Sequence, residues 1–206
     1  MLTFLLATRN RHKVRELKRL LRFPARFLTM DRFEALRSAR EDGATFRSNA
    51  AKKAIAVSRR IPLPVLAEDS GIEVRALGGK PAVRSARFAG PAQNDSANNR
   101  KILRLLDRVP RSRRQARYVC CMALAVDGEV VRFFEGTCAG AIALKPAGKT
   151  GFGYDPLFIP AGQRRTMAQL GSRVKDRISH RAQAARKLDR WLEARTRTMT
   201  VARRYL

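Results

Sequence analysis

Two neighbouring carboxylates, Glu68 and Asp69, are the residues whose types could most directly do chemistry. Acidic residues are scarce, with 17 Asp and Glu against 44 Lys and Arg, so their placement is informative. The pair follows the apolar run Val65–Ala67 and precedes Ser70-Gly71, a place where open α/β sheets commonly carry site residues. Carboxylates there suit a hard cation such as Mg²⁺ or a general base, and the alternative is a turn with an Asp cap.

A basic segment, Thr8–Lys13, stands where an apolar run leads into a helical pattern. Free backbone N–H groups and the positive end of a helix dipole favour an anion at such a place, and Lys13 adds a point charge. The glycines of a Walker A loop are missing. The segment therefore predicts either a phosphate site or an ordinary Asn cap with basic neighbours.

Two later segments combine groups that suit a nucleoside. The loop Gly151–Asp155 offers glycines for close approach, aromatic rings for stacking on a base and one carboxylate, although a tight turn explains it equally well. Ser179-His180-Arg181 places two donors at the start of a helical pattern, but a single histidine is more often structural. Neither a Ser/His/Asp order nor a zinc spacing is present in the sequence.

Apolar periodicity predicts the elements that position these groups. Strands are expected at Leu2–Ala7 and Val65–Ala67, and a central strand at Ala116–Val126 turns at Asp127-Gly128 and returns over Val130–Phe134. Helices are expected after Asn10, over Thr45–Arg59, from about Asp95 and after Ser179. Together, these strands and helices predict an α/β fold whose mixed sheet contains one long hairpin.

Composition limits the class of protein. A chain of 206 residues with 45% apolar residues can bury a sizeable core, which argues against a disordered basic tail. Cys120, Cys121 and Cys138 lack metal-ligand spacing and predict small buried side chains in a reducing compartment, with the adjacent pair on opposite faces of a strand. The apolar start is too short for a signal peptide and no window could span a membrane, so we expect a soluble, cytoplasmic protein.

The net charge is the unusual quantity. It is +27, and 34 of the 44 basic residues are Arg. Such a field attracts polyanions, including nucleic acid, anionic membranes and nucleotide phosphates. A basic surface without a dedicated polyanion partner remains an equally good interpretation.

Six segments occur in order along the chain: Thr8-Arg9-Asn10-x-x-Lys13-x-x-Glu16, Glu68–Gly71, Gly78-Gly79-x-Pro81, Ser85–Gly90, Gly151–Pro156 and Ser179–Arg181. Their spacing resembles the inosine/xanthosine triphosphate pyrophosphatase family, the house-cleaning dITP/XTP enzymes. The resemblance runs from about Leu2 to Leu192. Each segment is weak alone, but six in register make chance agreement very unlikely.

The resemblance implies an elongated mixed β-sheet with flanking helices and two lobes around a central cleft. We expect residues 1–206 to form a single domain of this kind, in which residues 195–206 are, by their composition, a basic tail. It also implies a homodimer. The implied reaction is the Mg²⁺-dependent cleavage of ITP, XTP and their deoxy forms to the monophosphate and pyrophosphate.

Position by position, the resemblance assigns roles to residues of these segments. Asp69 would accept the proton of the attacking water and, with Glu41, bind the metal. His180 and Arg181 would donate hydrogen bonds to the 6-keto oxygen of hypoxanthine or xanthine. The other substrate contacts would come from Thr8, Arg9, Asn10, Arg11, His12, Lys13, Ser70, Phe152, Gly153, Tyr154, Asp155 and Lys175.

The chain departs from the family pattern where acids are usual. Arg40 precedes Glu41, and Ser48 and Gln169 each stand in place of a glutamate. Lost acids and a gained cation near the cleft would lower its affinity for Mg²⁺.

The competing hypothesis is a basic nucleic-acid-binding protein on the same fold, with catalysis weakened by the lost acids. The set of Asp69, Lys13, Lys175 and His180-Arg181 is intact, and a pure nucleic-acid binder would not require it. Aromatic residues are only 7% and show no series for stacking on single strands. The residues therefore favour the enzyme.

On either hypothesis, we expect non-specific binding to nucleic acid through the Arg-rich surface. The affinity for DNA of arbitrary sequence should fall steeply between low and physiological salt, because each neutralised phosphate releases a counterion. Fluorescence anisotropy of labelled DNA over a salt series measures this slope, which Asp69→Asn should leave unchanged. Sequence-specific binding that survives high salt would instead favour the nucleic-acid-binding hypothesis.

Overall fold

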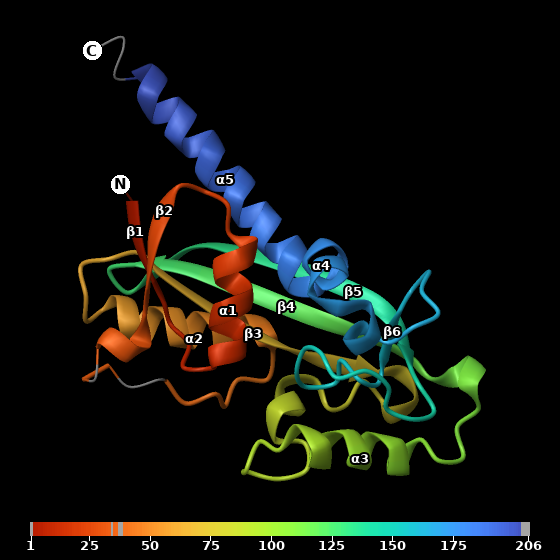
Figure 1. Ribbon diagram of the computed structural model, residues 1–206. Coiled ribbons are helices and arrows are strands. Elements are labelled where there is room, and N and C mark those ends of the chain that lie inside the picture. Colours follow the sequence, from red (N-terminus) through yellow and green to blue (C-terminus); the bar gives the residue numbers. More distant parts are fainter. Residues whose placement is uncertain (1, 34, 37–38, 203–206) are drawn as a thin grey trace.

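The computed structural model describes residues 2–33, 35–36 and 39–202. Within those residues, a six-stranded sheet has helices on both faces (Figure 1). The strands are β1 (Leu2–Leu6), β2 (Ala25–Thr29), β3 (Val65–Val74), β4 (Gln115–Val126), β5 (Glu129–Ile142) and β6 (Phe158–Pro160). The helices are α1 (Arg11–Leu20), α2 (Phe46–Ser58), α3 (Asp95–Leu105), α4 (Met167–Ile178) and α5 (His180–Ala202), with 3₁₀ turns at Met30–Arg32, Arg75–Leu77, Ala82–Arg87 and Arg111–Arg113.

The sheet is mixed, as the sequence predicts, with the order β2-β1-β3-β4-β5-β6. Strand β1 is parallel to both β2 and β3, whereas the pairs from β3 to β6 are antiparallel. The first parallel pair needs a crossover, and α1 supplies it. The β4–β5 hairpin turns at Asp127 and Gly128, whose φ angles of 50° and 82° are the positive values that a tight hairpin turn requires.

Alternation along β4 divides the hydrophobic core between the two faces of the sheet. Cys120 packs in a cluster with α1 and α5, and Cys121 packs in a second cluster with α2 on the other face. Both cysteines are buried and free, as expected. A third cluster, around Ile72, Ile102 and Phe158, closes the far end of the sheet against α3 and α4. No helix in the described part of the chain combines the length and hydropathy that crossing a membrane requires.

The expected position of Glu68–Gly71 after the end of a strand is wrong. Strand β3 continues to Val74, and β4 pairs with it throughout, placing Glu68 opposite Met122 and Asp69 opposite Cys121. The apolar pattern ends at the two acids, but the strand continues through them because groups on other elements neutralise their charge. Strands β2 and β6, helix α4 and the second half of β5 were also missed, since their apolar patterns are short or broken.

Two departures from the family pattern sit at helix caps. Ser48 and Gln169 are each the third residue after an N-cap threonine, and each side chain accepts a hydrogen bond from that threonine's backbone N–H. Both therefore complete a capping box, a position that glutamate commonly fills. Helix α5 is continuous to Ala202, so it includes residues 195–202 of the expected basic tail, and residues 203–206 lie outside the described residues.

Gly136 lets α5 cross close over β5. A Cβ atom built at this position would lie 2.1 Å from the carbonyl oxygen of His180 and 2.7 Å from the amide nitrogen of Ala184, both backbone atoms that cannot rotate away. The glycine thus sets how closely the first turn of α5 approaches the sheet.

We expect Gly136→Ala to lower the free energy of unfolding by about 1–3 kcal/mol, because the added methyl group overpacks this crossing. Urea denaturation followed by circular dichroism measures the change. Thr137→Val on the same strand, at an exposed position, is the matched control and should shift stability little. Equal stability of Gly136→Ala and wild type would show that α5 can move away from β5.

Candidate active site

A cavity of ≈ 630 Å³ collects the residues that the sequence assigned to a site. It opens between the β1–α1 loop, β3, the β5–β6 loop and the first turn of α5. Every residue to which the family resemblance assigns a role lines it except Arg11, which is exposed on the first turn of α1. Segments more than 170 residues apart in the chain thus converge on one space.

Strand β3 sends its two neighbouring acids to opposite faces of the sheet, because successive side chains of a strand alternate. Glu68 faces α1 and α5, where it contacts Lys13 and Arg181. Asp69 faces α2, where it contacts Asn49 and Lys53. The two adjacent acids are therefore not one acidic motif, because they lie in different environments on opposite faces of the sheet.

The guanidinium of Arg181, which is 1% exposed, joins three elements. Its Nε and Nη2 donate to the two carboxylate oxygens of Glu68, each at 2.8 Å. Its Nη1 donates to Glu16 Oε2 at 2.6 Å, and Nη2 also donates to Ser70 Oγ at 3.0 Å. These bonds leave one N–H of Nη1 without a partner among the described residues.

Two lysines extend this cluster toward the cavity. Lys13 Nζ lies 3.2 Å from Glu68 Oε1, and Lys175 Nζ lies 2.8 Å from Glu16 Oε1. Lys175 also donates to Asp155. Together with Arg181, these lysines balance three buried carboxylates with three cations, so the cluster is neutral when all its members are ionised.

Burial and neighbouring charge compete to set the protonation of this cluster. Burial by itself raises the pKa of Glu68, but the adjacent Arg181 and Lys13 outweigh it and hold that pKa well below its usual range. Burial raises the pKa of Asp155 despite its bond to Lys175. Burial opposes the charge of Arg181, yet the carboxylates around it raise its pKa further, so the guanidinium remains charged.

Asp69 stands at the other side of the cavity with both carboxylate oxygens engaged. Its Oδ2 accepts a hydrogen bond from Asn49 Nδ2 at 3.0 Å, and its Oδ1 accepts one from the backbone N–H of Ser70 at 3.0 Å. Lys53 Nζ lies 3.7 Å from Asp69 Oδ1 and 2.7 Å from Glu41 Oε1. The ammonium therefore bridges the two carboxylates that the sequence proposed as metal ligands.

The donor set at this point fits a hard divalent cation. Glu41 and Asp69 converge on one positive group, and Mg²⁺ is usually held by one or two carboxylates together with phosphate oxygens and water. Burial raises the pKa of Glu41, but Lys53 more than offsets this and lowers it, so the carboxylate is ionised near neutral pH. Among the described residues, no cluster of three or more acidic, His or Cys side chains could hold a metal without help from a ligand.

The β1–α1 loop forms the cap that the sequence left as one of two alternatives. Asn10 Oδ1 accepts from the backbone N–H groups of His12 at 3.0 Å and Lys13 at 3.1 Å, and Thr8 Oγ1 accepts from the N–H of Asn10 at 3.2 Å. The expected free N–H groups are therefore partly occupied. The loop's side chains still line the cavity, so the cap and an anion site are compatible.

The loop Gly151–Asp155 is closed by its own carboxylate and tied to α3. Asp155 Oδ2 accepts from the N–H of Phe152 at 3.0 Å. On α3, Asp95 accepts from the N–H of Gly153 at 2.6 Å, and Asn99 donates to the carbonyl of Gly153 at 3.0 Å. A tight turn and a binding loop are thus the same structure here.

His180 is the first residue of α5, after Ser179, whose hydroxyl caps the helix by accepting from the N–H of Ala182 at 3.2 Å. Its ring stacks on Tyr118 with centroids 4.6 Å apart and planes 5° apart. Burial, reinforced by Arg181, lowers the pKa of His180 well below its usual range, so the imidazole is neutral. Its Nδ1 is buried and has no hydrogen-bond partner among the described residues.

Sequence reasoning did not assign roles to Glu16, Asn49 and Lys53. Glu16 stands three residues after Lys13 on one face of α1, and Asn49 and Lys53 stand four apart on one face of α2. This spacing was visible in the sequence. The partners that give it meaning lie on β3, α4 and α5.

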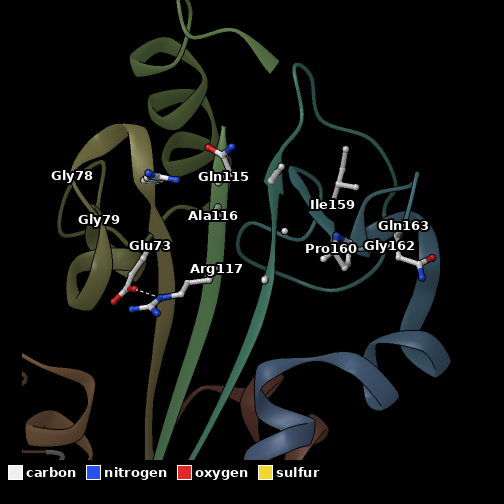
Figure 2. A pocket seen from close by; sticks show the side chains of 15 residues that line it. Glu73, Gly78, Gly79, Gln115, Ala116, Arg117, Ile159, Pro160, Gly162 and Gln163 are labelled. Atoms are coloured by element: carbon white, nitrogen blue, oxygen red, sulfur yellow. Dashed lines mark hydrogen bonds and ion pairs between the residues drawn. The ribbon is translucent and has the colours of Figure 1, made fainter. Parts of the chain in front are cut away.

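A second depression, of ≈ 830 Å³, lies at the far end of the sheet (Figure 2). Its lining includes small residues of β4 and β5, such as Ala116 and Gly140. Arg117, which also lines it, pairs with Glu73 at 2.6 Å. It contains none of the predicted site residues. The buried charges and the unpaired imidazole nitrogen make the smaller cavity the candidate active site.

Known proteins are similar to this chain in sequence and in fold. Residues 4–191 match the Ham1 family. The chain belongs to the Ham1 family. A dITP/XTP pyrophosphatase of Geobacillus kaustophilus is 46% identical over 192 residues, which cover 91% of this chain and 93% of the relative. Another dITP/XTP pyrophosphatase, from Bacillus subtilis, is 42% identical over 193 residues, covering 92% of this chain and 96% of the relative.

Solved structures of Ham1 proteins confirm the expected fold class. The HAM1 protein of Coxiella burnetii is 37% identical, with a TM-score of 0.86 over 94% of this chain and 100% of that chain. The Ham1 protein of Staphylococcus aureus is 36% identical, with a TM-score of 0.84 over 94% of this chain and 99% of that chain. The expected mixed α/β fold is therefore that of the Ham1 family.

For this Ham1 protein, we expect Glu68→Gln to lower the free energy of unfolding at neutral pH by about 3–5 kcal/mol, because it leaves buried cations short of a counter-charge. Since the folded pKa of Glu68 is lowered, its ionised form stabilises the fold above the ordinary glutamate pKa of about 4.3, and this contribution is lost as the pH falls toward the folded value. Denaturation series from neutral pH down to pH about 3 measure the difference.

The difference in free energy of unfolding between wild type and Glu68→Gln should therefore become smaller at acid pH. Glu129→Gln removes an exposed carboxylate and is the matched control, with a small effect at any pH. A gap that stays constant with pH would show that Glu68 acts by shape and not by charge.

Proposed function

We propose that this protein hydrolyses non-standard purine nucleoside triphosphates, ITP, XTP and their deoxy forms, to the monophosphate and pyrophosphate. The observation that carries the proposal is a single cavity with cations and a carboxylate pair at one side and a stacking ring with an unpaired imidazole nitrogen at the other. A triphosphate and a purine base need these two kinds of surface. The dITP/XTP pyrophosphatases at 42–46% identity support the same substrates.

The triphosphate would lie against the β1–α1 loop. Arg9, Lys13 and Lys53 line this side and offset the roughly four negative charges of a triphosphate. Thr8, Asn10 and Lys175 add polar contacts, and Arg11 and His12 complete the segment that the family resemblance assigns to substrate.

Asp69 would be the general base for an attacking water. Its carboxylate lines the cavity and is held in place by Asn49 and the backbone of Ser70, so its orientation is set before substrate arrives. Glu41 and Asp69 would hold Mg²⁺ together with phosphate oxygens, and Lys53 would then move from between them toward the phosphates. A bound divalent cation would stabilise the negative charge on the phosphoryl group under attack and on the pyrophosphate that leaves.

The purine base would be recognised at the first turn of α5. A 6-keto oxygen can accept from His180 Nδ1 if the neutral ring carries its proton there, and from the uncommitted N–H of Arg181. The 6-amino group of adenine cannot accept, so binding ATP would leave buried donors unpaired. Ser70 and Phe152–Asp155 would surround the nucleoside.

We also propose, from the family resemblance, that the protein acts as a homodimer of single-domain, two-lobed chains. The competing nucleic-acid-binding role has one observation in its favour, the net charge of +27. That charge is compatible with catalysis, because most of the basic side chains lie outside the cavity. The enzyme remains the better explanation of the buried cluster of charges around Arg181.

We expect Asp69→Asn to reduce pyrophosphate release from ITP and XTP by about 10²–10⁴-fold while nucleotide binding persists, because the amide keeps the shape of the carboxylate but accepts no proton. The assay compares ITP, XTP, GTP and ATP with and without Mg²⁺, and calorimetry measures binding. Asp107→Asn, at an exposed position outside the cavity, is the matched control. Retention of more than about a tenth of the wild-type rate would exclude Asp69 as the base.

Selectivity gives an independent test. Wild type should have a higher kcat/KM for ITP and XTP than for ATP and GTP. His180→Asn should lower the ratio of kcat/KM for ITP to kcat/KM for ATP by about tenfold to a hundredfold. Arg181→Ala would also remove one of the two cations paired with each of Glu16 and Glu68, so its kinetics are informative only if the variant folds. An equal decrease in kcat/KM for all four nucleotides would mean that His180 positions the substrate without distinguishing its base.

A further inference from the structure

The rings of His12 and Phe152 stack on each other inside the cavity. Their centroids are 5.0 Å apart and their planes differ by 22°. His12 is an exposed residue of the first turn of α1, and Arg15 Nη2 donates to its Nδ1 at 3.0 Å. Phe152 is partly buried and belongs to the loop between β5 and β6. The contact therefore closes one part of the cavity with a side chain of the protein itself.

On the buried side, Phe152 lies close to cations that cannot leave. Lys175 Nζ is 4.6 Å and Arg181 Cζ is 5.6 Å from the centre of its ring. Both cations are held by buried carboxylates, at 5% and 1% exposure. His12, in contrast, is held by one ring contact and one exposed hydrogen bond. Of the groups around Phe152, His12 is the one that can be displaced.

The gap between the two rings cannot widen to admit a base. Aromatic rings stack with centroids about 4.5 Å or more apart, so a purine between them would need roughly twice the present separation. The loop that carries Phe152 is fixed on α3 through Gly153, and Glu16 fixes α1 on Lys175 and Arg181. Neither backbone is free to retreat, whereas the His12 side chain can rotate into solvent.

We propose that His12 is an internal competitor for the base-stacking face of Phe152, and that a purine base binds by displacing it. The inference rests on the proposed nucleotide substrate and adds how the base gains access. It assigns His12 to the nucleoside end of the cavity, whereas the family resemblance assigns it to the phosphates. The free protein thus keeps its stacking ring covered until a base of sufficient stacking area replaces the imidazole.

Binding of the two halves of a nucleotide tests this assignment. In His12→Ala, the affinity for inosine should rise by about two- to tenfold, the value of one aromatic pair, because no side chain has to be displaced. The affinity for inorganic tripolyphosphate should not rise. Unchanged or weaker inosine binding by His12→Ala would overturn the proposal. Lys18→Ala, at an exposed position on α1, is the matched control for loss of a long side chain and should bind inosine as wild type does.

Proton NMR reads the displacement directly, since the chain has only two histidines and His180 is buried. The ring protons of His12 should resonate upfield in the free protein because of the Phe152 ring current, and Phe152→Leu should remove that shift. Addition of inosine to wild type should move them downfield as His12 leaves. Ring protons that stay upfield with inosine bound would mean that His12 stacks on the base, which would overturn displacement.

These outcomes are separable from the proposed function. Wild type that releases no pyrophosphate from ITP would count against the proposed function. Wild type that turns over ITP, with inosine affinity unaltered in His12→Ala, would count against the displacement alone.

Discussion

A guanidinium with almost no exposed surface constrains this molecule more than any other group. Removing an ion from water costs several kcal/mol, so Arg181 can be buried only where carboxylates meet it in good geometry. Glu68 on β3 and Glu16 on α1 provide that geometry, with contacts of 2.6–2.8 Å. The first turn of α5 must therefore lie over the middle of β3 beside α1, and Gly136 provides the space on β5.

The same cluster connects stability to the candidate chemistry. Lys175 joins Glu16 to Asp155, which in turn closes the loop that carries Phe152. A ring that could stack on a base is thus held by the charges that hold the core together. Because the cluster is neutral when ionised, further positive charge at the cavity comes from exposed side chains that line it, such as Arg9 and Arg87.

Surface charge and site charge are separate features of this chain. The net charge of +27 acts at long range and is screened by salt, whereas the ion pairs around Arg181 and Asp69 are buried and much less screened. Ser48 and Gln169, which looked like lost acids, cap α2 and α4 and keep the hydrogen bonds that those helix ends need. Arg40 is the departure that does line the cavity.

Local pattern in the sequence determined the β4–β5 hairpin, helices α1, α2 and α3, and the segments from which site residues come, because hydrophobic periodicity and turn residues act over short distances. Only the tertiary structure decided that β3 runs on through Glu68 and Asp69 and turns these neighbours toward different partners. It also decided that Arg181 is held mainly by carboxylates and that His12 covers Phe152. Groups distant in the sequence decide whether a charged residue can lie inside a strand and whether a hydrogen-bond donor is occupied. Hydrophobic periodicity carries no information about those distant groups.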